Sequence, residues 1–266
     1  MSMTMLAVLG LVAGSAAGLL AGLLGIGGGI VIVPVVYYGL VQSGVAPDQA
    51  AHVAVATSLA AIGPAAITSF LGHWRAGHAD LSFLRDWGPG IAVGVVVAQF
   101  MAPHVRGAVL SGVFGLFCLV FAVRFAFPAY FKPFLATAPG GTFRIASALG
   151  IGAVSGFAGI GGGILTNIVM VVSGLPMHKS IGRAAAAGVV VSVPASIAAA
   201  LASQAQNATA VGSIDLAIWI CIAPAQAVGA WIGARLAARI EGDHLSRLLA
   251  VTLCGTGASM LYASWS

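Results

Sequence analysis

Two short glycine-rich segments carry the residue pattern that most directly suggests chemistry. Residues 25–29 and 159–163 both read Gly-Ile-Gly-Gly-Gly. Neither is a nucleotide-phosphate loop, because a Walker loop continues into Gly-Lys-Ser/Thr and a dinucleotide loop needs a preceding strand and a downstream acid. Four glycines in five residues break a helix and leave N–H groups without partners at the positive start of the next helix. The pattern therefore predicts a cradle for an anion, with close helix packing as the alternative.

The candidate substrate-binding residues are the glycines of these segments and four polar residues elsewhere. They are Gly25, Gly27, Gly28, Gly29, Thr57, Ser58, Gly159, Gly161, Gly162, Gly163, Asn167 and Arg183. Hydroxyl and amide groups can donate hydrogen bonds to an oxyanion, and arginine adds a positive charge. Thr57 and Ser58 could instead bond back to a carbonyl of their own helix. For the amides Asn167, Gln99 and Gln226 we favour hydrogen bonds between helices.

Three further residues are predicted to gate the path or to recruit anions: His52, His178 and Lys179. Lys179 and Arg183 are four residues apart, so they share one face of a helix, and His178 precedes them. Such a basic group attracts anions from solution. The alternative is that these side chains anchor the protein at a membrane interface.

The acidic residues are informative because all six lie at loops or segment ends. They are Asp48, Asp80, Asp86, Asp215, Glu241 and Asp243. Proton and sodium relays usually keep a carboxylate within the membrane, so the sequence predicts that no carboxylate couples transport to an ion. The three cysteines lie in apolar runs and form no CxxC pair, and we expect neither a metal site nor a cofactor.

The composition places all of these residues in a membrane protein. Of 266 residues, 60% are hydrophobic and 6% are charged. A soluble domain carries roughly 25% charged residues, so a water-soluble enzyme or binding domain is excluded. Continuous apolar runs also exclude a transmembrane β-barrel, whose strands alternate. The expected partners are membrane lipid and a small anion, not nucleic acid, and an oligomer is left open.

The chain divides into two similar halves. Residues 1–130 form repeat 1, residues 131–143 the linker, and residues 144–266 repeat 2, each repeat with five helical segments. The predicted segments are 5–24, 30–42, 49–72, 88–104 and 107–127, then 145–158, 164–175, 179–203, 214–234 and 244–263. The second segment of each repeat is too short to span a bilayer at about 1.5 Å per residue. Whether it crosses fully or is re-entrant is left open.

The basic residues decide between two topologies. If all ten segments count as passes, only Arg106 falls on one side, and ten basic residues fall on the other. They are Arg75, Arg85, Arg124, Lys132, Arg144, Lys179, Arg183, Arg235, Arg239 and Arg247. If the first two segments of each repeat are instead counted as one broken pass, the basic residues divide about evenly between the two sides. The positive-inside rule therefore favours five passes per repeat, inverted repeats and two periplasmic termini. The predicted fold class is an all-α membrane protein of about ten segments in two inverted repeats with glycine-broken short helices.

The same motifs resemble the TauE/SafE sulfite-exporter family. The resemblance rests on the paired glycine segments, on residues 52–58 (His-Val-Ala-Val-Ala-Thr-Ser), and on Pro89, Gly94 and Ala98 in the fourth segment. It covers essentially the whole chain. It implies a multi-pass permease of the bacterial inner membrane for small sulfur-containing anions such as sulfite, sulfonates or sulfoacetate. Arg183 stands where repeat 1 has Thr57, which implies a stronger anion contact there.

We therefore predict a secondary transporter that exports its anion by alternating access around one site at the two glycine-rich helix starts. An inside-negative membrane potential drives an anion outward. An anion channel and an uptake permease for other small organic anions are the alternatives. An intramembrane enzyme is not expected, because the sequence has no GxSxG or HExxH motif and no buried carboxylate pair.

Overall fold

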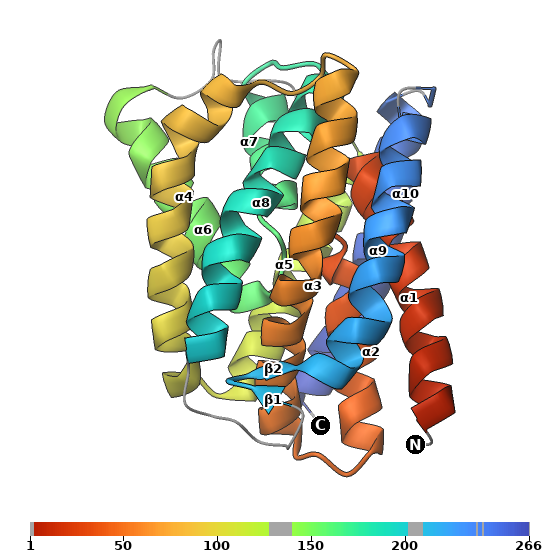
Figure 1. The fold of residues 1–266 in the computed structure, drawn as a ribbon. Coiled ribbons are helices and arrows are strands. Elements are labelled where there is room, and N and C mark those ends of the chain that lie inside the picture. The colour runs from red at the N-terminus through yellow and green to blue at the C-terminus, as the bar shows by residue number, and fades with distance from the viewer. Residues whose placement is uncertain (1–2, 128–139, 202–209, 238, 241, 266) are drawn as a thin grey trace.

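The computed structural model describes residues 3–127, 140–201, 210–237, 239–240 and 242–265. Most of the predicted linker lies outside the described residues, as do Lys132 and Glu241. Within the described residues the chain folds into ten α-helices, one short 3-10 helix and two short strands (Figure 1). The predicted all-α class is therefore confirmed.

The helices follow one another through the two halves of the chain. They are α1 (Met3–Leu24), α2 (Gly29–Gln42), α3 (Pro47–Arg75), α4 (Leu81–Met101), α5 (Gly107–Ala126), α6 (Gly141–Ala158), α7 (Gly163–Val172), α8 (Met177–Leu201), α9 (Leu216–Ala237) and α10 (Gly242–Trp265). The 3-10 helix η1 is Ala102–His104, and the strands β1 (Ala210–Val211) and β2 (Ile214–Asp215) pair antiparallel. Among the described residues, six helical stretches are long and apolar enough to cross a membrane. The chain is a multi-pass membrane protein.

Each of the ten predicted segments corresponds to a helix, but most of the boundaries differ by one or more residues. Three of the helix starts show why. Helix α4 begins at Leu81 rather than at residue 88, because Asp80 caps it by accepting a hydrogen bond from the Phe83 N–H at 2.8 Å. Helix α6 begins at Gly141, inside the predicted linker. Residues 214 and 215 form strand β2 instead of the first turn of α9.

The glycine segments break the helices as predicted. Gly25, Gly27 and Gly28 follow α1 with φ values of 68°, 78° and 77°, and Gly159 and Gly162 follow α6 with 70° and 72°. Residues with a side chain rarely adopt this left-handed conformation, so these turns require glycine. The helices that follow, α2 and α7, have only 14 and 10 residues. In Figure 1, α2 runs toward the end that holds both termini, and α7 runs toward the opposite end.

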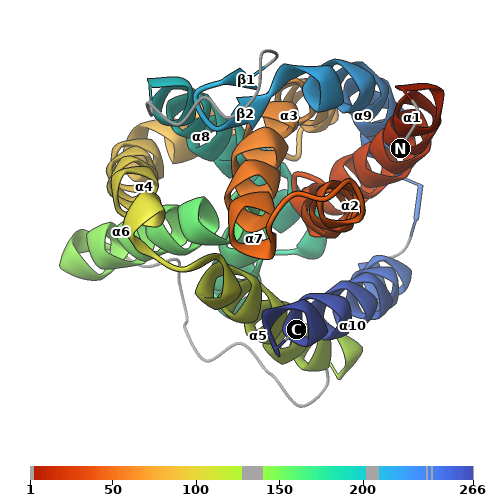
Figure 2. The ribbon, with the colours of Figure 1, turned by 90° about the horizontal axis from the view of Figure 1, so that it is seen from below.

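Glycine also brings long helices together across the bundle. Helix α1 packs against α9, α4 against α6, α3 against α8, and α5 against α10. Figure 2 shows the α4–α6 and α5–α10 pairs side by side. A Cβ on Gly18 or Gly22 of α1 would collide with the backbone of α9, and one on Gly94 of α4 or Gly152 of α6 with the backbone of the partner helix. Small residues let these backbones touch.

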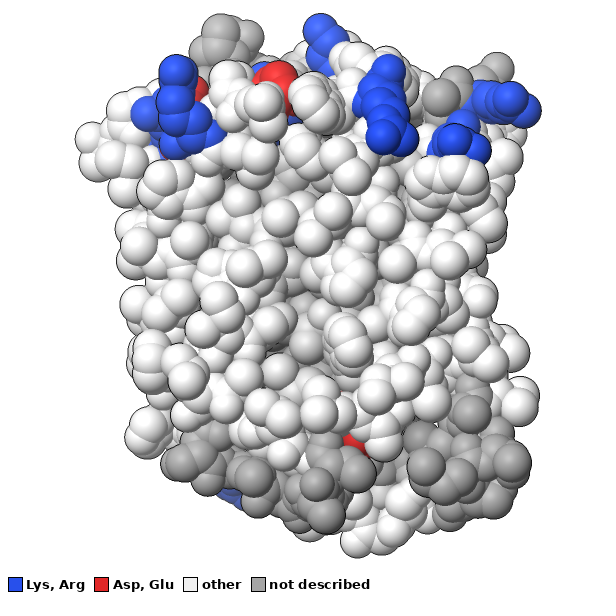
Figure 3. Space-filling model, in the orientation of Figure 1, with Lys and Arg blue, Asp and Glu red and all other residues white. Residues whose placement is uncertain are grey.

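The charged side chains gather at one end of the molecule. Figure 3 shows Lys and Arg along the end opposite the termini, and a broad uncharged band below them. We call this the basic end. The described basic residues there are Arg75, Arg85, Arg124, Arg144, Lys179, Arg183, Arg235, Arg239 and Arg247. Arg106 precedes α5 at the opposite end. Among the described residues, the basic side chains therefore lie mostly at one end of the molecule.

The helix crossings lead to a first prediction. Replacing Gly152 with Ala places a Cβ 2.8 Å from the Val95 nitrogen and closer still to the Ile91 carbonyl oxygen, so α4 must shift. Overpacking of this kind typically costs about 1–3 kcal/mol. We expect Gly152→Ala to lower the melting temperature of the detergent-purified protein. Gly150→Ala in the same helix is the control, because no atom lies within 4 Å of its Cβ. Equal melting temperatures would contradict close packing at Gly152.

Candidate functional site

The two glycine segments meet in the middle of the bundle. A Cβ on Gly27 would lie 3.2 Å from the Cα of Gly161, and a Cβ on Gly161 would lie 3.5 Å from the Cα of Gly27. Ile62 of α3 packs against both glycines. We call residues 25–29 and 159–163 together the glycine centre. The sequence predicted one site at the two glycine-rich helix starts, and the structure brings the two segments into direct contact.

The starts of the two short helices are also in reciprocal contact. A Cβ on Gly29, the first residue of α2, would collide with the carbonyl oxygen of Gly159. A Cβ on Gly163, the first residue of α7, would collide with the carbonyl oxygen of Gly25. Each helix start thus touches the first residue of the other glycine segment, and a side chain at either position would separate them.

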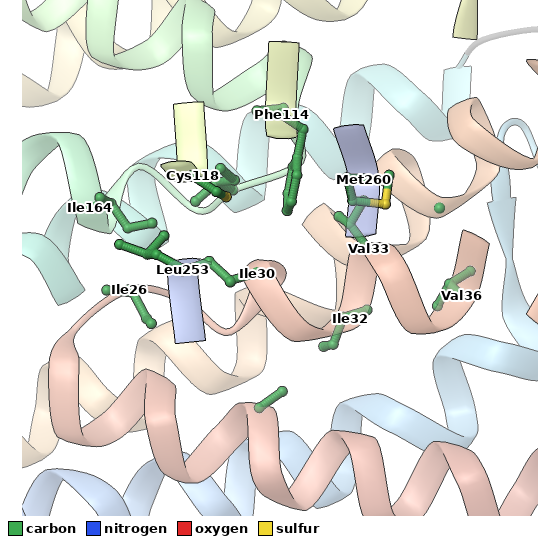
Figure 4. Packing of buried hydrophobic residues seen from close by; sticks show 14 of the residues in the cluster. Ile26, Ile30, Ile32, Val33, Val36, Phe114, Cys118, Ile164, Leu253 and Met260 are labelled. Carbon is green, nitrogen blue, oxygen red and sulfur yellow. The ribbon is translucent and has the colours of Figure 1, made fainter. Parts of the chain in front are cut away.

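The backbone N–H groups at these helix starts lack partners. None of the hydrogen bonds among the described residues begins at the N–H of Gly29, Ile30, Gly163 or Ile164. All four residues are buried, and Ile30 and Ile164 are fully buried. Figure 4 shows Ile26, Ile30 and Ile164 within one cluster of apolar side chains. Buried N–H groups are nearly always paired, so unpaired ones at two helix starts mark a place for an acceptor such as an anion.

Polar side chains without partners surround the second glycine segment. The hydroxyls of Ser155 and Thr166 and both amide atoms of Asn167 are buried and make no hydrogen bond to any described residue. Ser155 Oγ lies 3.6 Å from the Cβ position of Gly162. Thr166 and Asn167 are fully buried in the first turns of α7. Orphan polar groups of this kind call for an explanation in a native structure, and a bound ligand is one.

Asn167 lies on the face of α7 that meets the first glycine segment. It follows Gly163 by four residues, so the two share a face, and Cβ bonds lean toward the helix start. At the matching place in α2, Val33 contacts Gly159. Asparagine thus stands where the other short helix has valine, so the two short helices present different chemistry to the glycine centre.

The three amides that were expected to bond between helices behave differently. Gln226 Nε2 of α9 donates to the Gly27 carbonyl at 2.8 Å, and Gln99 Nε2 of α4 donates to the Gly156 carbonyl at 2.9 Å. The prediction is confirmed for these two. It is wrong for Asn167 within the described residues, because neither atom of its amide has a hydrogen-bond partner there.

The two predicted hydroxyl residues of α3 are separated by the structure. Ser58 Oγ donates to the Gly159 carbonyl at 3.1 Å, so Ser58 belongs to the glycine centre. Thr57 Oγ1 accepts a hydrogen bond from the Asp215 N–H at 3.0 Å, which ties α3 to strand β2. Neither hydroxyl bonds back to its own helix, so that alternative was wrong.

Arg183 lies at the basic end and is paired. Its Nη2 is 3.0 Å from Asp80 Oδ2, and its Nη1 lies 3.5 Å from the Met170 sulfur. Burial alone would raise the pKa of Asp80, but hydrogen bonds from Ser82 and the Phe83 N–H, together with Arg183, hold that pKa below its usual value. The structure does not bring Arg183 to the glycine centre, where Gly25 instead faces Ile181 and Ala184 of α8.

The predicted gating residues occupy opposite ends. His52 bridges backbone carbonyls, with Nδ1 2.8 Å from Asp48 O and Nε2 3.0 Å from Val105 O. It lines a pocket of about 390 Å³ with Gln99 and Ser213. Lys179 is exposed at the basic end. His178 stacks there on His78, with ring centroids 5.2 Å apart, and His73 is 6.3 Å from His78. His73 and His78 were missed because they meet His178 only through the fold.

Comparisons with known proteins agree with this architecture. The family model "Sulfite exporter TauE/SafE" matches residues 10–260. A "Probable membrane transporter protein" of Haemophilus influenzae is 30% identical over 69% of this chain and 69% of its own length. The "Probable membrane transporter protein YunE" of Bacillus subtilis is 30% identical over 62% of this chain and 66% of its own length. No solved structure matches the chain. The expected resemblance is confirmed: the chain belongs to the TauE/SafE sulfite exporter family of membrane transporters.

Proposed function

We propose that the protein is a secondary transporter that exports small sulfur-containing anions, such as sulfite, sulfonates or sulfoacetate, through the glycine centre. The observation that carries this proposal is the pair of opposed helix starts whose N–H groups lack partners. Hydrogen-bond donors at a helix start favour oxyanions. The orphan groups of Ser155, Thr166 and Asn167 supply further hydrogen bonds around the same place.

An inverted repeat underlies the proposed alternating access. Helix α1 packs on α9 as α6 packs on α4, and α3 pairs with α8 as α5 pairs with α10. First and fourth helices of opposite halves thus make matching contacts. The glycine segments touch at Gly27 and Gly161, which closes the path at its centre. Opening it toward one end and then the other requires the halves to move against each other, as in inverted-repeat transporters.

Export follows if the basic end faces the cytoplasm, as the positive-inside rule favours. Lys179 and its basic neighbours would then raise the local concentration of anions on the side from which they leave. An inside-negative potential contributes about 2.3 kcal/mol per charge per 100 mV toward the outside, and about twice that for a dianion. Export driven by the membrane potential needs no carboxylate that couples transport to a proton or a sodium ion.

The transport function can be measured in proteoliposomes. We expect saturable flux of sulfite, a sulfonate or sulfoacetate that depends on membrane potential, at turnover rates far below channel conduction. Empty liposomes and the Gly163→Val protein, whose side chain would force the two segments apart, serve as controls. Absence of flux for all three substrate classes would refute the proposal, and single-channel currents would identify an anion channel instead.

Asn167 tests whether the glycine centre binds the anion. The substitution Asn167→Leu keeps a similar volume and removes an amide that has no partner among the described residues. Replacing an unpaired buried polar group with an apolar one does not destabilise the fold. We expect an unchanged or higher melting temperature without ligand, and loss of most of the stabilisation that the substrate anion gives the parent protein.

Gln99→Leu is the matched control for this experiment. Its amide is satisfied by Gly156, so the substitution should lower the melting temperature by removing a hydrogen bond worth about 1 kcal/mol. The stabilisation by anion should remain. If Asn167→Leu keeps the full anion response, Asn167 is a packing residue and the site lies elsewhere.

The orientation in the membrane is a separate prediction. A reporter fused after Ser266 should be active outside the cytoplasm, because the chain ends opposite the basic end (Figure 1). A reporter fused after Gly77, between α3 and α4 at the basic end, should be cytoplasmic. The reverse pattern at both points would invert the assignment, and the same side for both would exclude the proposed number of passes.

A further inference from the structure

Three histidines from three separate elements meet at the basic end. His73 lies near the end of α3, His78 in the loop before α4, and His178 in the first turn of α8. The rings of His78 and His178 stack at 5.2 Å, with 26° between their planes, and His73 lies 6.3 Å from His78. Close backbone contact fixes this arrangement, because a Cβ on Gly182 of α8 would collide with the His78 carbonyl. We call these residues the histidine cluster.

Each ring of the histidine cluster holds an unused proton acceptor or donor. His73 Nε2 lies 2.9 Å from the carbonyl oxygen of Gly22, which can only accept, so Nε2 carries the hydrogen and Nδ1 is a free base. The Nδ1 atoms of all three rings are buried and have no hydrogen-bond partner among the described residues. Three such nitrogens in one place are unusual for a structural cluster.

The charged neighbours do not neutralise a proton placed on this cluster. They are Arg75 on α3, Asp80 before α4, Lys179 and Arg183 on α8, and Arg235 on α9. Asp80 is bound to Arg183, and the Arg235 guanidinium lies 3.6 Å from the Trp231 ring centre. The described residues of α1 and α7 carry no ionisable side chain. Burial, and then the proximity of His178, lower the pKa of His78.

The histidine cluster lies at the top of a seam that leads to the glycine centre. His73, Ser69, Ala66 and Ile62 follow one another on one face of α3, and Ile62 touches both glycine segments. Between them, Ser69 lines a narrow pocket of about 180 Å³ together with Gly25, Gly27 and Gly188. The Ser69 hydroxyl has no partner among the described residues. An anion released from the cluster would therefore pass along polar orphan groups.

We propose that the histidine cluster is a second anion site, which binds a small oxyanion together with a proton at the mouth of the path. The inference rests on the proposed function, because it assumes that the glycine centre is the destination. A proton on one imidazole is disfavoured by burial, and a second by repulsion from the first. An oxyanion that accepts hydrogen bonds from the Nδ1–H groups removes both penalties. Binding of anion and proton must then reinforce one another.

The sign of the pH dependence follows from this linkage. Burial and mutual repulsion disfavour a proton on the empty cluster, and a bound anion favours one, so binding takes up a proton. Affinity is highest at acidic pH and falls as the pH rises through the range in which histidine titrates. A single linked proton limits the change to about tenfold in dissociation constant per pH unit.

The test uses the full-length protein in detergent with sulfate and methanesulfonate, whose own charges do not change in the chosen range. Dissociation constants are measured between about pH 5.5 and pH 8, and proton uptake is followed with an indicator in weak buffer. We expect weaker binding at higher pH and about one proton taken up per anion. The double substitution His78→Gln with His178→Gln should abolish the uptake and flatten the pH profile. His73 is not substituted, because its ring is hydrogen-bonded to the carbonyl oxygen of Gly22.

His104→Gln is the matched control, since His104 is an exposed histidine in η1 at the opposite end. The His104→Gln substitution should leave the pH profile of anion binding and the proton uptake unchanged. Melting temperatures without anion verify that the double variant is folded. A pH profile or proton uptake that survives the double substitution would overturn the inference, as would pH-independent binding by the parent protein. In both cases anion binding itself, and so the proposed function, would stand. No binding of either anion at any pH would overturn both.

Discussion

The structure depends on the unpaired N–H groups of two helices that begin inside an apolar interior. Gly29 and Gly163 start α2 and α7 among fully buried isoleucines, and no described residue accepts a hydrogen bond from their N–H groups. In such surroundings each unpaired group costs several kcal/mol. Two such helix starts in contact double the cost. Under the proposed function, an anion bound there relieves this cost at both helix starts, so the least favourable feature of the fold would also be the source of its affinity for an oxyanion.

Glycine serves two separate purposes in this chain. In the glycine centre it permits left-handed backbone, as at Gly25 and Gly159, and it lets one helix start touch the other segment. In the long helices, as at Gly22 and Gly152, it lets backbones cross in contact. The anion-cradle and packing interpretations of the sequence are therefore compatible. Close crossing of α1 with α9 and of α4 with α6 brings the two glycine segments to the same depth.

The sequence was sufficient for features that depend on local spacing. Hydrophobic runs located all ten helices, and paired glycines located their breaks, because both patterns act within a few residues. The partners of single polar side chains could not be predicted. Arg183 is neutralised by Asp80, and Asn167 lacks the bond that Gln226 makes, because contacts between distant helices decide these cases. The meeting of His73 with His178 likewise required the fold. Spacing along the sequence does not predict contacts between side chains on distant helices.

The distribution of formal charge explains how a site can both bind and release an anion. The glycine centre holds no charged side chain among the described residues, and Arg183 forms an ion pair with Asp80 at the basic end. A fixed arginine beside the helix starts would deepen binding and slow release, since charge-assisted hydrogen bonds are about twice as strong as neutral ones. Amides and partial helix charges bind more weakly. Under the proposed function, the full charges at the basic end would raise the local anion concentration, and the uncharged dipoles of the glycine centre would bind the anion weakly enough to release it.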